Sequence, residues 1–174
     1  MKIKLALFSV ALCIGTVSHA QYNDSHLNAG LGVNSLGVPL YLSYDFPIVE
    51  DINLSIWTSF QATTDRYFYN GYDHKLKQTI FGFGVLSQYY IDRVVNLPEQ
   101  FDVYGGLGLG FYVWQTNTDP LFDSYRDSGG GGVGIIGTVG GRYYISSKVA
   151  LNLEIAATSR NRLSGGHFGV SFKL

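Results

Sequence analysis

The sequence predicts an all-β chain, an eight-stranded antiparallel up-and-down barrel that crosses a membrane. Between residues 103 and 114 every large aliphatic side chain falls on one parity, opposite Tyr, Gly and Trp. Successive strand side chains point to opposite faces, so this segment is a strand with one apolar face. The same alternation returns along most of the chain without a helical interruption, and an export signal precedes it.

In the first half of the chain each predicted strand is separated from the next by a turn or a break. Asn34 to Gly37 is a turn signal, Pro47 to Asp51 breaks the pattern, and residues 63–75 form a polar, aromatic loop. The aliphatic positions then give four predicted strands, at 28–33, 38–46, 52–61 and 81–90.

The second half repeats this organisation. Residues 92–100 contain Pro98, which interrupts pairing, and residues 116–131 form the longest loop. Residues 146–148 are a short reversal, and residues 160–166 turn the chain once more. The remaining predicted strands cover 103–114, 133–145, 149–158 and 168–174.

Closure of this meander leaves no unpaired strand edge, which a bilayer would penalise by several kcal/mol per exposed group. The chemistry of the two faces predicts which one meets lipid. Charged residues make up 14% of the chain, against roughly 25% in typical soluble domains. The face opposite the aliphatic residues is mostly Gly, Asn, Ser, Gln and Tyr, which suits a narrow lumen. We therefore expect Phe83, Leu107 and Ile155 to face hydrocarbon.

The N-terminus predicts export. Lys2 and Lys4 precede an apolar stretch, and Ser18-His19-Ala20 supplies the small residues of a cleavage site. The expected organisation is a signal peptide at 1–20 and one barrel domain at 21–174. Cys13 lies within the signal, so the mature chain is expected to contain no disulfide and no cysteine-bound metal. A net charge of −1 gives no basic surplus for nucleic acid.

Three stretches carry a resemblance to a known family: Gly140 to Ile145, Lys148 to Leu151 with Glu154, and Gly169 to Leu174. They resemble the small outer-membrane β-barrels, which include barrels similar to outer-membrane proteins A and X. The resemblance implies eight strands, periplasmic termini, a Gram-negative outer membrane and insertion by its assembly machinery. Members commonly end in an aromatic residue, whereas this chain ends in Leu174 with Phe172 two positions earlier.

Charged residues of the polar parity predict a network in the lumen. Arg142 is expected opposite Asn152 and diagonal to Glu154, and Lys173 can join from the last strand. A structural network that neutralises buried charge is the favoured interpretation. The alternative is a gate across a narrow water path.

Other motifs give weaker predictions of chemistry. Residues 132–137 fit G-x-G-x-x-G, but the strand continues through them, so no helix begins there to hold a phosphate. Ser164 and His167 suggest a lipid hydrolase, although Ser164 lies in a glycine turn and no His-x-Ser pair is present on a strand. His26 and His74 lack companions at ligand spacing, so no metal and no other cofactor is expected.

The two long outer loops are rich in Tyr, Trp and Arg, residue types that favour binding surfaces. They either bind external partners or anchor the rim of the barrel. The interaction candidates, beside Trp114, are Arg66, Tyr67, Phe68, Tyr69, Tyr72, Phe122, Tyr125 and Arg126.

The sequence thus predicts a monomeric, non-enzymatic barrel with a structural or surface-interaction role. Its expected partners are outer-membrane lipids and lipopolysaccharide, with the assembly machinery during insertion. A narrow channel or small-ligand transport barrel is the first alternative, and an enzyme that modifies lipid A is the second. A soluble ligand-binding barrel is the least favoured.

Overall fold

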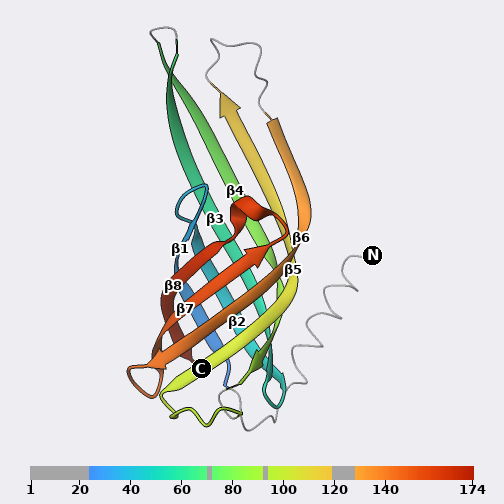
Figure 1. Cartoon of the computed structure of the whole chain (residues 1–174), viewed down its shortest axis with the longest axis vertical. Coiled ribbons are helices and arrows are strands. Elements are labelled where there is room, and N and C mark those ends of the chain that lie inside the picture. Colours follow the sequence, from blue (N-terminus) through green and yellow to red (C-terminus); the bar gives the residue numbers. More distant parts are fainter. Residues whose placement is uncertain (1–23, 70–71, 92–93, 119–127) are drawn as a thin grey trace, which may run out of the picture.

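The computed structural model describes residues 24–69, 72–91, 94–118 and 128–174. Within them, eight antiparallel strands pair in sequence order and close between the first and the last, which confirms the predicted fold class (Figure 1). The predicted signal peptide lies outside the described residues. The strands are β1 (His26–Asn34), β2 (Leu40–Val49), β3 (Ile52–Tyr69), β4 (Tyr72–Tyr90), β5 (Phe101–Thr118), β6 (Ser128–Tyr144), β7 (Val149–Thr158) and β8 (Gly165–Lys173), with the 3-10 turn η1 (Asn161–Leu163) before β8.

The barrel wall has two heights. Strands β1, β2, β7 and β8 contain 9 or 10 residues, whereas β3 to β6 contain 17 to 19. We call the part of β3–β6 that rises above the short strands the tall wall, the rim from which it rises the tall rim, and the opposite rim the base. Figure 1 shows the tall wall at the top and the C-terminus at the base.

The tall wall corrects the sequence prediction of loops at 63–75 and 116–131. Strand β3 continues to Tyr69 and β4 begins at Tyr72, so that residues 63–69 pair with residues 72–78. Likewise β5 continues to Thr118 and β6 begins at Ser128. These segments lack aliphatic alternation because they rise above the apolar belt. Their Thr, Tyr and Phe residues nevertheless favour strands.

The aliphatic parity faces outward, as the sequence predicted. Leu107 is 71% exposed and Ile155 is 67% exposed, and exposed apolar side chains surround the whole barrel. Aromatic pairs continue the belt, with ring centroids 5.5 Å apart for Phe83 and Phe111 and 5.0 Å apart for Phe101 and Tyr143. An apolar surface of this extent is far larger than water-soluble monomers expose.

Among the residues that the structure describes, no helix is long and apolar enough to cross a membrane.

Two lumen glycines make room for the indole of Trp57. A Cβ built on Gly110 would lie 2.7 Å from Trp57 Cζ2, and one built on Gly84 would lie 2.9 Å from the same atom. The ring therefore reaches from β3 across the inner faces of β4 and β5, where it packs against Tyr112 at a centroid distance of 5.8 Å. Any side chain at Gly110 would displace it.

We expect Gly110→Ala to lower the free energy of unfolding by about 1–3 kcal/mol, because the new methyl group overpacks the lumen against Trp57 and Ile136. Urea unfolding of the refolded barrel, followed by tryptophan fluorescence, measures the change. Gly105→Ala on the same strand is the control, since its Cβ would meet its nearest neighbour at 3.8 Å. Equal losses for both variants would contradict this account of Trp57.

Candidate functional site: a plugged lumen

Arg142 of β6 closes the lumen in its lower half. The residue is 2% exposed, and its guanidinium forms a salt bridge with the carboxylate of Asp45 on β2. It also donates hydrogen bonds to Tyr90 Oη at 2.5 Å and to Ser171 Oγ at 3.2 Å. One side chain from β6 thereby reaches β2, β4 and β8, on opposite sides of the barrel. We call this group the Arg142 layer.

Neutral groups complete the Arg142 layer. Asn28 Nδ2 donates to Asp45 Oδ2 at 2.7 Å, while Asn28 Oδ1 accepts from Ser171 Oγ at 2.5 Å. The Tyr104 ring lies 5.0 Å from the guanidinium carbon, which adds a cation–π contact. A buried ion pair with this many hydrogen bonds offsets its desolvation and fixes the geometry around it.

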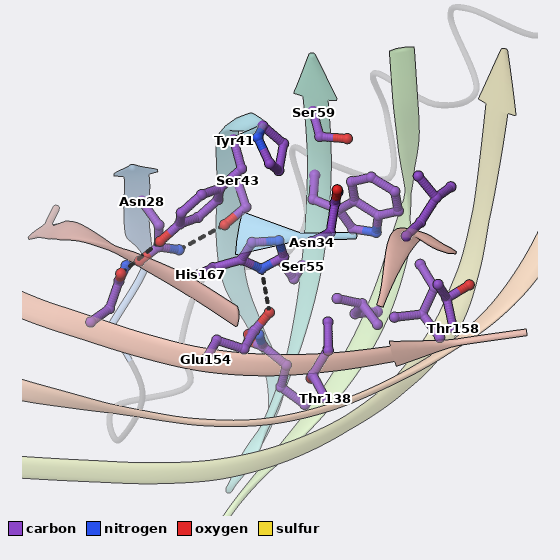
Figure 2. A pocket seen from close by; sticks show the side chains of 18 of the residues that line it. Asn28, Asn34, Tyr41, Ser43, Ser55, Ser59, Thr138, Glu154, Thr158 and His167 are labelled. Carbon is purple, nitrogen blue, oxygen red and sulfur yellow. Dashed lines mark hydrogen bonds and ion pairs between the residues drawn. The ribbon is translucent and has the colours of Figure 1, made fainter. Parts of the chain in front are cut away.

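Glu154 belongs to the next layer, nearer the tall rim. It accepts a hydrogen bond from Tyr104 Oη at 3.1 Å, and its Oε1 lies 3.5 Å from His167 Nδ1 (Figure 2). Tyr104 therefore contacts Arg142 through its ring and Glu154 through its hydroxyl. The predicted register of Arg142 opposite Asn152 is confirmed.

The third residue of the predicted network lies at the base. Lys173 forms a salt bridge with Asp24, and both side chains are partly exposed. Arg142 thus pairs with Asp45, Glu154 lies beside His167, and Lys173 pairs with Asp24. Asp45, the carboxylate closest to Arg142, was not predicted from the sequence. The available signal was its position on the polar parity of a strand, between Tyr44 and Phe46 on the other face.

A cavity of about 80 Å³ lies in the lumen above the Arg142 layer (Figure 2). Its lining includes Trp57, Gln88 and Thr138. Within the described part of the chain, Trp57 Nε1, Gln88 Oε1 and Thr138 Oγ1 are buried without a hydrogen-bond partner. Polar groups around a space of this size bind ordered water. The described residues contain no cluster of three or more His, Cys, Asp or Glu that could hold a metal.

Ser164 and His167, the two residues that suggested a lipid hydrolase, have different surroundings. Ser164 Oγ accepts a hydrogen bond from the Thr158 amide at 3.0 Å, next to η1. The His167 ring instead lies in the lumen against Tyr41, with a centroid distance of 4.9 Å. The glycine motif at 132–137 lies wholly inside β6, as the sequence predicted.

The predicted interaction residues lie on or beyond the tall wall. Arg66 is exposed on β3, Tyr67 to Tyr69 complete that strand, and Tyr72 begins β4. Their placement in a loop was wrong, because the β3–β4 hairpin continues through them. Three further candidates lie outside the described residues: Phe122, Tyr125 and Arg126.

No protein-family model and no curated protein matches the chain. Solved barrels do. The N-terminal barrel domain of Pseudomonas aeruginosa OprF is 12% identical with a TM-score of 0.57, covering 88% of this chain and 98% of that one. A major outer membrane protein from Thermus thermophilus is 10% identical with a TM-score of 0.61, over 87% and 98%. The attachment invasion locus protein Ail of Yersinia pestis is 11% identical with a TM-score of 0.53, over 88% and 100%. The chain therefore has the fold of the small outer-membrane β-barrels that its sequence resembles.

Proposed function

We propose that the chain is an integral protein of a Gram-negative outer membrane, with a structural or surface-interaction role rather than a catalytic one. The observation that carries this proposal is the continuous outward belt of exposed apolar side chains on a closed barrel. A closed barrel satisfies its backbone groups internally, which hydrocarbon requires. The similarity of fold to outer-membrane barrels supports the same location.

The two rims support an orientation. Strands of 9 or 10 residues are long enough to cross the hydrocarbon layer when tilted. The base carries three connections between strands, of which those at 50–51 and 145–148 are short and the one at 91–100 is longer. It also carries the start of β1 and the end of β8, so we assign it to the periplasm. The tall rim then faces the exterior, and the tall wall extends roughly 25 Å along the strands beyond the belt, at about 3.3 Å per residue. This wall would present Arg66 and its aromatic neighbours to envelope components or external partners.

The filled lumen supports a role other than general diffusion. An eight-stranded barrel leaves space for little beyond its own side chains, and here the Arg142 layer closes that space. We propose a monomer that is surrounded by outer-membrane lipid and lipopolysaccharide. Insertion would require the outer-membrane assembly machinery, and a cleaved signal peptide at 1–20 would direct export.

Gel mobility of the membrane-fractionated protein tests this proposal. We expect detergent to be required for extraction, and the unboiled barrel to migrate differently from the boiled chain because closed strands resist detergent unfolding. Mass spectrometry of the same sample should give a chain that begins at Gln21. Release into the soluble fraction without detergent, with no effect of boiling, would overturn the membrane assignment.

A further inference from the structure

We propose that the mouth of the lumen at the tall rim binds the oxyanion of a phosphorylated or sulfated sugar. This inference rests on the proposed function, since the site must face the exterior. The mouth cavity is open to the outside and has a volume of about 300 Å³, at the lower end of the range for small-molecule sites. It lies between the inner face of the tall wall and the η1 turn. Its polar lining is Gln78, Trp114, Ser159, Arg160 and Arg162.

Arg160 is held in place on the wall of this cavity. Its guanidinium carbon lies 5.6 Å from the centroid of the Trp114 ring. A Cβ on Gly132 would lie only 1.9 Å from Arg160 Nη2, so the side chain occupies the space that this glycine leaves open. The backbone is fixed as well, because the Arg160 amide donates to Thr158 Oγ1 at 3.2 Å. Such a preordered side chain loses little entropy on binding.

The charged side chains among the described lining residues of the mouth cavity are all positive. Two guanidinium groups line it, and no carboxylate is among its described lining residues. Unlike Arg142, which pairs with Asp45, neither Arg160 nor Arg162 forms an ion pair with any described residue. A guanidinium fork matches the oxygens of phosphate or sulfate through paired hydrogen bonds. Within the described part of the chain, the mouth therefore presents two guanidinium groups that form no ion pair and can bind an oxyanion.

The rest of the lining indicates a sugar ester rather than a bare ion. Ser159 Oγ accepts a hydrogen bond from the Ile135 amide at 3.1 Å, so its own O–H remains free to donate. The Gln78 amide provides both a donor and an acceptor for hydroxyl groups. Ile80 and Leu163 add an apolar surface beside them, which fits the C–H face of a sugar ring. The ester can belong to a lipid-linked sugar of the outer leaflet or to a soluble saccharide.

Titration of the full mature chain in nanodiscs of neutral phospholipid tests the site. We expect glucose 6-phosphate and galactose 6-sulfate to bind and glucose to bind far more weakly. Arg160→Gln should weaken the binding of both esters at least about tenfold, through loss of a charge-assisted hydrogen-bond pair. Lys148→Gln removes one positive charge from the exposed turn between β6 and β7 at the base, so it is the control and should leave the affinity unchanged.

Nanodiscs that contain lipopolysaccharide separate the two sources. Weaker binding of the added esters in these discs than in neutral ones assigns the site to the lipid sugar phosphate, because the lipid then competes for the mouth. Unchanged binding assigns it to a soluble saccharide. Absence of ester binding in neutral lipid, or equal affinity of the wild type and Arg160→Gln, overturns the proposal. Arg162→Gln gives the same comparison where Arg160→Gln fails to show heat-modifiable mobility. A chain that keeps this mobility but binds no ester refutes the sugar site and leaves the membrane assignment intact.

Discussion

Replacement of Asp45 by asparagine is expected to lower the free energy of unfolding by about 3–5 kcal/mol. Asp45 is fully buried, and Arg142 beside it is 2% exposed. The substitution preserves the shape of the side chain but removes the closer of two carboxylate partners of the guanidinium. Only Asp102, at 3.8 Å, then remains to pair with this charge in a site that water barely reaches. Urea unfolding in lipid vesicles, with tryptophan fluorescence as the signal, measures the loss.

Two comparisons isolate the effect of burial. Lys173→Met removes the salt bridge to Asp24, in which the Lys173 side chain is 37% exposed and the Asp24 side chain is 46% exposed. This variant should change stability by less than about 1 kcal/mol. The double variant Asp45→Leu with Arg142→Met removes both charges and should recover most of the stability lost by Asp45→Asn. If Asp45→Asn and Lys173→Met destabilise the barrel equally, the Arg142 layer is not the buried ion pair described above.

The fold could be predicted because the aliphatic alternation of the sequence records the height of the apolar layer on the outer face of the barrel. It marked β7 at its observed bounds, 149–158, and it assigned Leu107 and Ile155 to the outer face. Where strands rise above that layer, one face no longer needs to be apolar. The pattern then ends before the strand does, which is why the tall wall was predicted as loops.

Side-chain contacts in the lumen could be predicted only between neighbouring strands. The register of the β6–β7 hairpin follows from its short turn, and this placed Arg142 opposite Asn152 correctly. Asp45 lies on β2, which is not adjacent to β6 in the sheet. Contacts across a barrel depend on the tilt and stagger of all its strands together. Local pattern does not specify these quantities, so the partner of Arg142 was missed.

Arginine at Leu153 is expected to destabilise the barrel in lipid by about 2–4 kcal/mol. Leu153 lies in the middle of β7 and is 62% exposed on the outer face. If that face contacts hydrocarbon, the middle of a short strand lies near the bilayer centre, where a charged side chain is most unfavourable. Unfolding of Leu153→Arg in vesicles, compared with the wild type, measures the loss.

Val33→Arg supplies the matched control, because Val33 is 68% exposed on the same outer face but lies next to the end of β1 at the tall rim. There the side chain reaches the headgroups, and the expected loss is about 0–1 kcal/mol. The two sites have similar exposure on the outer face but lie at different heights on the barrel. Water around the barrel would make both substitutions nearly neutral, since surface arginines away from packed contacts change stability little. A clear excess for Leu153→Arg therefore requires a solvent that is apolar at mid-height and polar at the rim, which a bilayer provides.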